Sequence, residues 1–296
     1  MNSLDYFDSR GLKYQKEVDT AKVSSIRAGG VASLAVYPQA IDAFCKLISF
    51  LHKTGERYKI VGKCTNMYFS DSGFNGVLVF TSALDRISMG DGFIYAECGA
   101  GLGALCRRAL EVGYDLSASL SGIPGSVGGA VRMNAGAFGS AISDILIEAD
   151  VYDADNDKMV QMSREDLDFK YRHSVIQEGN LFVLGAKFKV KSTQKSEILE
   201  KIVDFSIKRR ASQPSLPSLG SFFKAFEDVS ASKLIDDSGL KGFSIGGASV
   251  SEKHAGFIVN NGGATSSDVN ALAEIVEEKV FEKYSRRLLR EVEFCE

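Results

Sequence analysis

In the first two thirds of the chain, short strand-like runs of apolar or alternating residues alternate with runs in which apolar residues recur at helical spacing. A helix is predicted over residues 41–53, where apolar side chains recur at helical spacing through Phe44, Leu47, Ile48 and Leu51. A second helix is predicted over 104–112, with Gly113 as its stop. Apolar or alternating runs predict strands at residues 34–37, 58–61, 77–80, 93–97, 145–152 and 181–190.

The last third of the chain has a different organisation. A helix is predicted from about Glu197 to Arg210, and a Ser/Pro stretch, Ser212–Gly220, follows it. We place a domain boundary in this region, because the helix and the residues after Gly220 are numerous enough to form a compact domain. The last helix has the clearest pattern. It begins with a capping-box-like Thr265 and Asp268, and one face carries Val269, Leu272, Ala273, Val276 and Val280.

Composition narrows the class of protein. With 296 residues the chain can form two or three small domains. The formal net charge of -3 comes without a dominant basic face, so no nucleic-acid partner is expected. No apolar run reaches membrane-spanning length, and Met1–Asp8 lacks the apolar region of a secretory signal. A cytoplasmic protein without a membrane partner is therefore expected.

The cysteines give no sign of a metal site or of a disulfide framework. They are scattered, odd in number and without paired metal-ligand spacing, at Cys45, Cys64, Cys98, Cys106 and Cys295. Free thiols in a reducing compartment are the simplest interpretation. We expect no bound metal.

Glycine-dense segments are the candidate chemistry. Glycines let backbone N–H groups converge on an anion, so such loops can hold a pyrophosphate. Gly99–Gly103 lies between a predicted strand and a predicted helix, but its spacing is GxGxG rather than the GxGxxG of a dinucleotide fingerprint. We interpret it as a tight strand-to-helix connection. Gly122–Ala130 contains four glycines, a proline and the hydroxyl of Ser126, which predicts a nucleotide-phosphate site of open identity.

Taken together, these segments resemble the UDP-N-acetylenolpyruvoylglucosamine reductase family. The match runs in order from about Ser24 to Glu291, nearly the whole chain, and the ordered set is far more specific than any one piece. Its pieces are Arg27–Gly30, Gly62–Asn66 with Ser70-Asp71, Gly122–Ala130 with Met133–Gly136, Tyr171–Ser174, Arg209–Pro214, Gly220–Lys224, Gly239–Gly242, Ile245–Ala248, Ser251–Ala255 and Glu291-Val292.

The resemblance implies an α+β fold. It comprises an FAD-binding domain of the vanillyl-alcohol-oxidase/p-cresol-methylhydroxylase type, built from two subdomains, and a C-terminal α+β substrate-binding domain. We place these parts at residues 1–82, 83–200 and 201–296. The chain resembles the shorter subtype, which lacks a large inserted substrate lid. FAD and NADPH are the implied cofactors, a UDP-sugar enolpyruvyl ether is the implied small-molecule substrate, and a monomer is expected.

In the implied reaction NADPH reduces FAD, and hydride then passes to the enolpyruvyl double bond. The carbon next to the carboxylate becomes carbanionic and must be stabilised and protonated. Three residues match the family's catalytic positions. Ser221 matches the proton donor, since an enolate is basic enough to accept from a hydroxyl. Arg172 matches the arginine that suits the carboxylate and the developing enolate. Glu291, if protonated, could donate to the enolate.

The same resemblance assigns binding roles. Substrate contacts are implied for Tyr171, Lys224, Lys253 and His254, although a lone histidine such as His254 is as often a packing residue. FAD contacts are implied for Gly62, Lys63, Cys64, Thr65, Asn66, Gly122, Ile123, Pro124, Gly125, Ser126, Gly128, Gly129, Asn134 and Ala135.

The chain departs from the family pattern at several positions. Cys64 and Thr65 replace the usual Gly-Ser, and Cys64 adds a Cβ where the backbone is otherwise bare. Ala225 stands where the family tends to have asparagine, which removes a side-chain contact to the substrate diphosphate. Arg290 replaces a common proline, which we expect to loosen the chain before Glu291. The altered contacts at Cys64 and Ala225 support one alternative, an inactive FAD- or nucleotide-binding protein, and an FAD-dependent oxidase of the same superfamily is a second alternative.

Overall fold

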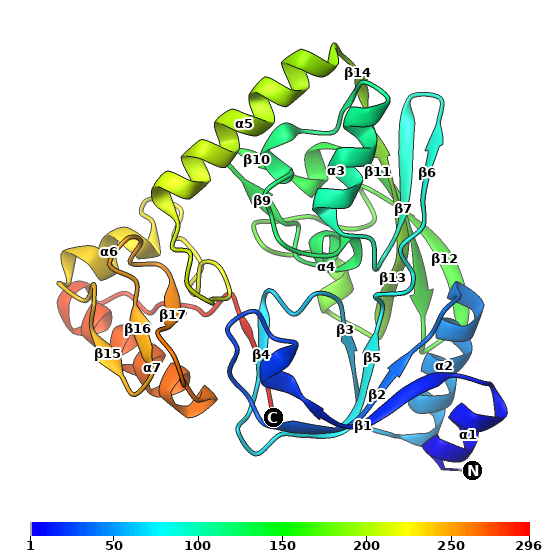
Figure 1. Cartoon of the computed structure of the whole chain (residues 1–296), viewed down its shortest axis with the longest axis horizontal. Coiled ribbons are helices and arrows are strands. Elements are labelled where there is room, and N and C mark those ends of the chain that lie inside the picture. Colours follow the sequence, from blue (N-terminus) through cyan, green and yellow to red (C-terminus); the bar gives the residue numbers. More distant parts are fainter. Residues whose placement is uncertain (1) are drawn as a thin grey trace. The chain divides into compact units, whose positions relative to one another are not determined.

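The computed structural model describes residues 2–296 (Figure 1). By internal contacts the chain groups into two compact units. Unit 1 comprises residues 1–15, 34–63 and 76–207, and unit 2 comprises residues 16–33, 64–75 and 208–296. Short segments from the first quarter of the sequence thus belong with the C-terminal part of the chain. The division at residues 82 and 200 stays a prediction.

A four-stranded sheet contains the first strands of the chain, in the order β1-β2-β5-β3. Its strands are β1 (Lys13–Asp19), β2 (Val31–Tyr37), β3 (Tyr58–Val61) and β5 (Phe74–Phe80), and β3 pairs with β5 in parallel. Helix α1 (Ser3–Ser9) precedes it. Helix α2 (Ile41–Thr54) buries the four predicted apolar residues, Phe44, Leu47, Ile48 and Leu51. The local pattern therefore predicted this helix and its packing face correctly.

A five-stranded antiparallel sheet is the centre of unit 1. Its order is β12-β11-β13-β7-β6 (Figure 1). The strands are β6 (Ile87–Gly90), β7 (Phe93–Glu97), β11 (Leu146–Asp153), β12 (Lys158–Ser163) and β13 (Leu181–Lys189). Helices α3 (Leu102–Glu111) and α4 (Val127–Arg132) connect the glycine segments to this sheet. The buried core of unit 1 is shared by the sheet and these helices, including Ile94, Leu105, Val131, Val151 and Phe188.

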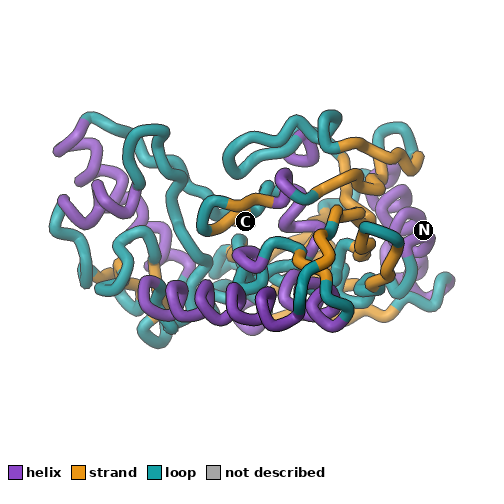
Figure 2. Tube along the Cα trace, turned by 90° about the horizontal axis from the view of Figure 1, so that it is seen from above, coloured by secondary structure: helices purple, strands orange, loops and turns teal. Residues whose placement is uncertain are grey.

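Short elements complete unit 1. The two-residue strands pair as β14 with β8 and β10 with β9. They span β8 (Tyr114–Asp115), β9 (Gly136–Ala137), β10 (Ser140–Ala141) and β14 (Lys191–Ser192). Single 3-10 turns lie at residues 118–120, 142–144 and 175–177 of unit 1, and another lies at residues 20–22 of unit 2. The long helix α5 (Lys195–Ser212) follows, uninterrupted in Figure 2, and its residues 195–207 group with unit 1.

Unit 2 packs α7 (Ser266–Tyr284) and α6 (Ala231–Asp237) with small sheets. Its antiparallel sheet has the order β15-β16-β17, with β15 (Ser244–Ile245), β16 (Ala248–Val250) and β17 (Ile258–Asn260). In addition, β4 (Met67–Phe69) pairs in parallel with the C-terminal β18 (Glu293–Cys295). This pairing brings residues 64–66 next to β18.

The capping box of α7 forms as predicted. The Thr265 hydroxyl accepts from the amide of Asp268, and the Asp268 carboxylate accepts from the amide of Thr265. All five predicted apolar residues of this helix are buried. Asp71 adds a second cap from a distant loop, since its carboxylate accepts from the amides of Ser266 and Ser267 at 2.7 and 2.9 Å. The family's Ser70-Asp71 motif therefore fastens the β4 loop to α7.

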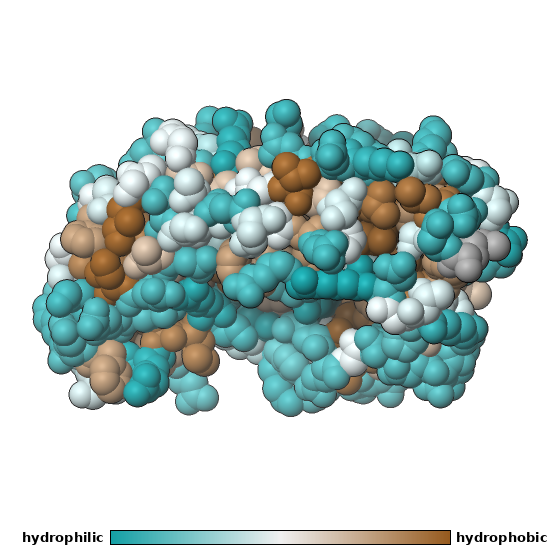
Figure 3. Space-filling view, turned by 90° about the horizontal axis from the view of Figure 1, so that it is seen from below, coloured by the Kyte–Doolittle hydropathy of each residue, from teal (hydrophilic) through white to brown (hydrophobic). Residues whose placement is uncertain are grey.

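The surface in Figure 3 is mainly hydrophilic, with apolar residues in scattered areas. Within residues 2–296 no helix combines the length and the apolar character needed to cross a membrane.

Candidate active site

Two predicted cofactor segments touch each other in unit 1. Gly62 follows β3, and a Cβ placed on it would lie 2.3 Å from Oγ of Ser126. That distance is far inside van der Waals contact, so only glycine allows the two loops to approach this closely. Lys63, the next residue, lies over the third glycine segment, because a Cβ on Gly101 would be 2.3 Å from its Nζ. Three glycine-rich segments far apart in the sequence therefore converge.

The loop Gly122–Ala130 is fixed by backbone hydrogen bonds. The Ser126 hydroxyl accepts from the amide of Gly129 at 3.3 Å and so caps α4. The amides of Val127 and Gly128 donate to the carbonyls of Ala100 and Cys98, both at 2.8 Å. The loop is thus held against the strand-to-helix connection at Gly99–Gly103.

Gly99 itself has a structural reason to be glycine. A Cβ there would lie 1.8 Å from the carbonyl oxygen of Thr81. This is consistent with the interpretation of Gly99–Gly103 as a tight connection. Carbonyls in and next to this segment accept hydrogen bonds from the Gly122–Ala130 loop, a role that the GxGxG spacing did not indicate.

The remaining groups of this loop fit a bound pyrophosphate. The amide of Ile123 donates to the carbonyl of Leu120 at 3.0 Å. Among residues 2–296, the amide N–H groups of Gly122 and Gly125 have no acceptor, and Gly122 and the neighbouring Pro124 are exposed. Backbone donors without an acceptor in the protein, with the ammonium of Lys63 close to the supporting loop, suit a diphosphate. These residues of unit 1 could hold the phosphates of FAD.

Asn134 links the end of this loop to the segment that carries Arg172. Its side-chain Nδ2 donates to the carbonyl of Lys170 at 3.0 Å, and its Oδ1 accepts from the amide of Ser143 at 3.0 Å. The preceding turn is closed by Ala135, whose amide donates to Ala130 at 2.9 Å. Asn134 therefore acts within the protein as a connector, in addition to its predicted place beside the cofactor.

Arg172 adopts a conformation that a side chain rarely tolerates, with φ +53°. Its guanidinium donates to the carbonyl of Gly136 at 3.0 Å and lies 5.1 Å from the ring centroid of Tyr171. The buried Ser174 hydroxyl holds the segment by donating to the carbonyl of Arg132 at 2.7 Å. Unit 1 thus brings the segment of Tyr171 and Arg172 next to residues 132–136, which follow the Gly122–Ala130 loop.

Cys64 begins the part of the phosphate segment that groups with unit 2. It has φ +47°, a left-handed conformation that favours glycine, and this explains the glycine that the family has there. Its side chain is buried, and burial, with a smaller effect of Cys295, raises the pKa of the thiol to about 12. Cys64 is therefore a neutral packing residue, followed by the half-buried Thr65.

Asn66 contacts the C-terminal segment. Its side-chain Nδ2 donates to the carbonyl of Glu291 at 3.0 Å, and its own carbonyl accepts from the amide of Glu293 at 2.9 Å. A predicted cofactor residue and a predicted catalytic residue, 225 positions apart, are thereby neighbours.

Ser221 and Glu291 lie on facing segments of unit 2. The amide of Glu291 donates to the carbonyl of Phe222 at 2.9 Å, and the amide of Lys224 donates to the carbonyl of Leu289 at 2.8 Å. These two bonds form a short antiparallel ladder, with Phe223 opposite Arg290. Ser221 is half-buried and follows Gly220, whose φ of +79° turns the chain into the ladder. Oε2 of Glu291 is buried.

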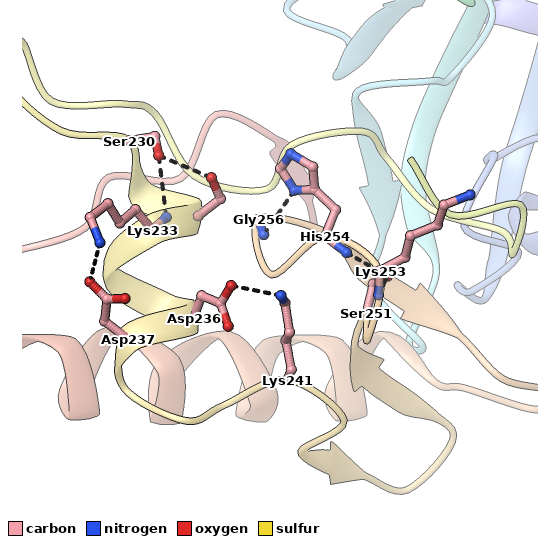
Figure 4. A network of polar contacts seen from close by, with 10 residues as sticks. Ser230, Lys233, Asp236, Asp237, Lys241, Ser251, Lys253, His254 and Gly256 are labelled. Atoms are coloured by element: carbon pink, nitrogen blue, oxygen red, sulfur yellow. Dashed lines mark hydrogen bonds and ion pairs between the residues drawn. The ribbon is translucent and has the colours of Figure 1, made fainter. Parts of the chain in front are cut away.

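The other predicted substrate residues have different surroundings. His254 belongs to a turn next to Ser221, because the amide of Phe222 donates to the carbonyl of Gly256 at 2.8 Å. Its Nδ1 accepts from the amide of Gly256 at 3.2 Å, and burial lowers the pKa of the ring, so Nε2 carries the proton. Lys253 extends in another direction (Figure 4), and its ammonium donates to the carbonyl of Arg210 at the end of α5.

The expectation that Arg290 loosens the chain was wrong. Its guanidinium forms a two-bond ion pair with Glu277, at 2.6 and 3.2 Å, and donates to Oδ1 of Asn270 at 2.9 Å. Both acceptors are on α7, so the arginine anchors the segment before Glu291. The sequence placed Glu277 and Asn270 on one predicted helix, but it gave no signal that Arg290 would reach them.

Comparisons with known proteins show which families the chain matches. Residues 32–163 match the family described as FAD binding domain, and residues 213–295 match the family described as UDP-N-acetylenolpyruvoylglucosamine reductase, C-terminal domain. The UDP-N-acetylenolpyruvoylglucosamine reductase of Caldicellulosiruptor bescii is 38% identical over 292 residues, covering 98% of this chain and 93% of that protein. That of Petrotoga mobilis is 40% identical over 269 residues, covering 88% of each.

A solved structure is also similar over the whole chain. The crystal structure of UDP-N-acetylenolpyruvylglucosamine reductase (MurB) from Thermus caldophilus matches with a TM-score of 0.83 at 27% identity, covering 96% of this chain and 100% of that one.

The FAD-binding domain and the reductase C-terminal domain define a flavoprotein oxidoreductase. The predicted α+β fold class is confirmed. The chain belongs to the UDP-N-acetylenolpyruvoylglucosamine reductase family, and its cofactors are FAD and NADPH.

Proposed function

We propose that this chain reduces the enolpyruvyl group of UDP-N-acetylglucosamine enolpyruvate to give UDP-N-acetylmuramate, with NADPH as the source of hydride. The family membership supports the reductase activity and a UDP-sugar substrate. The product is a precursor for peptidoglycan, so the proposal includes a cytoplasmic location and a role in cell-wall synthesis. We further propose that the chain acts as a monomer.

One observation carries the proposal beyond family membership. The segments that carry Ser221 and Glu291 face each other in the short ladder of unit 2, where the amide of Glu291 donates to the carbonyl of Phe222, and Asn66 donates to the carbonyl of Glu291. A hydroxyl and a carboxyl group carried by two facing segments suit a reaction in which one carbon must receive a proton. An electron-transfer or oxygen-using site has no need of that pair.

The chemistry divides between the cofactor and the protein. FAD, when bound, supplies the hydride chemistry. Hydride reaches the terminal carbon of the enolpyruvyl double bond, and the electron pair moves onto the carbon next to the carboxylate. Ser221 donates its hydroxyl proton to that carbon, which completes the two-electron reduction. The basicity of the enolate compensates for the weak acidity of a serine hydroxyl.

Charge stabilisation is the role that we assign to the other two residues. Arg172 offers a fixed planar fork of N–H donors, which suits the substrate carboxylate and the negative charge that develops there. Glu291 donates to the enolate oxygen in its protonated form. Tyr171, Lys224 and His254 are proposed to hold the substrate. Lys253 is the weakest of these assignments, because its ammonium donates to the end of α5.

The flavin absorbance of the purified protein tests this function under anaerobic conditions. NADPH is added first and UDP-N-acetylglucosamine enolpyruvate second. The proposal requires bleaching by NADPH and recovery upon addition of the substrate. Recovery that occurs only when oxygen is admitted would support an oxidase instead. Bound FAD that NADPH cannot bleach would support the inactive binding protein, and failure to bind FAD would contradict both the reductase and the oxidase.

A further inference from the structure

Arg290 lies next to Glu291 in the chain, but its side chain points to α7. The guanidinium binds both carboxylate oxygens of Glu277, Nε to Oε1 at 2.6 Å and a terminal nitrogen to Oε2 at 3.2 Å. The side chains are 27% and 29% exposed, so this pair is partly shielded from water. Paired N–H···O bonds fix orientation as well as distance, which a single lysine bond does not achieve.

The helix end of this contact is firmly held. Asn270 accepts from Arg290 at 2.9 Å and from the hydroxyl of Tyr68 at 2.8 Å on the same Oδ1. Tyr68 is fully buried in β4, and β4 pairs with β18, the strand that begins two residues after Glu291. The C-terminal segment is therefore attached to α7 in two ways. Arg290 binds α7 directly, and β18 pairs with β4, whose Tyr68 also binds α7.

Glu291 is thus held on both sides. Before it, Arg290 fastens the chain to α7. After it, Asn66 binds the carbonyl of Glu291 and the amide of Glu293. The two backbone bonds of the ladder, to Phe222 and from Lys224, then fix the Glu291 segment relative to the segment that begins with Ser221.

We propose that Arg290 is a positioning residue that sets the register of the Glu291 segment against the Ser221 segment. This inference rests on the proposed function of Ser221 and Glu291. Arg290 acts through backbone placement, since its charge is already neutralised by Glu277. Loss of the anchor lets the carboxyl group and the hydroxyl shift relative to each other, while reduction of the flavin by NADPH is unaffected.

Proline at position 290 gives a rescue variant that distinguishes placement from charge. The amide of Arg290 donates no hydrogen bond within residues 2–296, because the ladder uses the amides of Glu291 and Lys224. Proline therefore removes no ladder bond, and its fixed φ restricts the chain by another means. Arg290→Ala removes the contacts to α7 and does not restrict the backbone at position 290.

The experiment compares wild type, Arg290→Ala and Arg290→Pro as FAD-loaded protein. Arg286→Ala is the matched control, because Arg286 forms an exposed two-bond pair with Asp228, at 2.6 and 2.7 Å, away from Glu291. Two quantities are measured. They are the amide hydrogen exchange of residues 222–224 and 289–293, and the single-turnover rates of flavin reduction by NADPH and of reoxidation by substrate.

Arg290→Ala should raise exchange at Glu291 and Lys224 and slow reoxidation by about tenfold to a hundredfold, because small displacements of reacting groups are costly. Flavin reduction should stay at the wild-type rate, and Arg290→Pro should recover most of both losses. Unchanged exchange and reoxidation in Arg290→Ala would overturn the proposal, as would a proline variant as slow as the alanine variant. If wild-type protein is not reoxidised by the substrate, the proposed function fails, while the exchange data still decide on Arg290.

Discussion

The backbone amide of Glu291 donates to the carbonyl of Phe222 at 2.9 Å, so the carboxyl-bearing residue lies one step from Ser221 on the facing segment. The side chain of Asn66 donates to the carbonyl of Glu291, and the carbonyl of Asn66 accepts from the amide of Glu293. Three segments from the beginning, the middle and the end of unit 2 thereby meet within a few hydrogen bonds. This explains why the family motifs near residues 66, 221 and 291 occur together.

Removal of the Glu291 carboxyl group should slow the reoxidation of the flavin by the substrate and leave flavin reduction by NADPH unchanged. Glu291→Ala should slow product formation by about a hundredfold, because a neutral donor to the enolate is lost. Glu291→Gln keeps a neutral N–H donor and should lose less. Stopped-flow measurement of reoxidation by substrate checks both, with the exposed Glu278→Gln on α7 as the control. Equal rates for the alanine variant and wild type would exclude Glu291 from the reaction.

The contact between Gly62 and Ser126 predicts a rescue of FAD binding. In Gly62→Ala the new Cβ meets Oγ of Ser126 at 2.3 Å, so the loops must separate. FAD affinity, measured by titration of the apoprotein, should fall by about tenfold, which is roughly 1.4 kcal/mol. Adding Ser126→Gly removes the atom that clashes and should recover part of the loss. A double variant that binds FAD no better than Gly62→Ala would contradict this account of the two loops.

The left-handed conformation of Cys64 predicts an unusual order of stability. In a buried position alanine is ordinarily more stable than glycine. At φ +47°, however, any Cβ is strained, and glycine removes a cost of about 1 kcal/mol. Cys64→Gly should therefore be at least as stable as Cys64→Ala in urea unfolding monitored by circular dichroism. A clearly more stable alanine variant would show that the conformation is not strained.

Asp71 predicts a dependence of stability on acid pH. Burial raises its pKa, but hydrogen bonds from Ser267 and Ser266 outweigh this, so the pKa lies below the ordinary value. Its stabilisation is fully present above the unfolded pKa of about 3.9 and is lost as pH falls through the lower folded pKa. Asp71→Asn should lower the free energy of unfolding by roughly 1 kcal/mol near neutrality, through the lost interaction with the start of α7.

The test of Asp71 is a pair of unfolding curves at several pH values. The gap between wild type and Asp71→Asn should be constant at neutral pH and should narrow as pH falls below about 4. A gap that stays the same down to the lowest pH at which both proteins fold would exclude the charge of Asp71 as its source.

Local pattern predicted the four longer helices well, α2, α3, α5 and α7, but not the short helices α1, α4 and α6. In α2 and α7 apolar residues recur at helical spacing, and Thr265 and Asp268 mark the start of α7, so each signal lies within a few residues. The strands β4 and β18 were not predicted. Each has three residues, and their pairing joins Met67 to Glu293, a contact for which no local pattern exists.

Motif matching found the segments of the candidate site, but not how they hold one another. Gly62–Asn66 and Gly122–Ala130 were both assigned to FAD, yet the contact of Gly62 with Ser126 depends on packing between distant loops. The hydroxyl of Ser126, expected to face a phosphate, caps α4. The anchoring of Arg290 to Glu277 was missed for the same reason, since it depends on how α7 lies against the C-terminal segment.

The role of Ser221 as proton donor is tested most directly by the single-turnover kinetics of Ser221→Ala. The FAD-loaded variant is first reduced by NADPH and then mixed anaerobically with UDP-N-acetylglucosamine enolpyruvate. Flavin reduction should proceed at the wild-type rate, whereas recovery of the flavin absorbance and formation of UDP-N-acetylmuramate should slow by at least about a hundredfold. Reoxidation and product formation at the wild-type rate would contradict the account and remove Ser221 from the reaction.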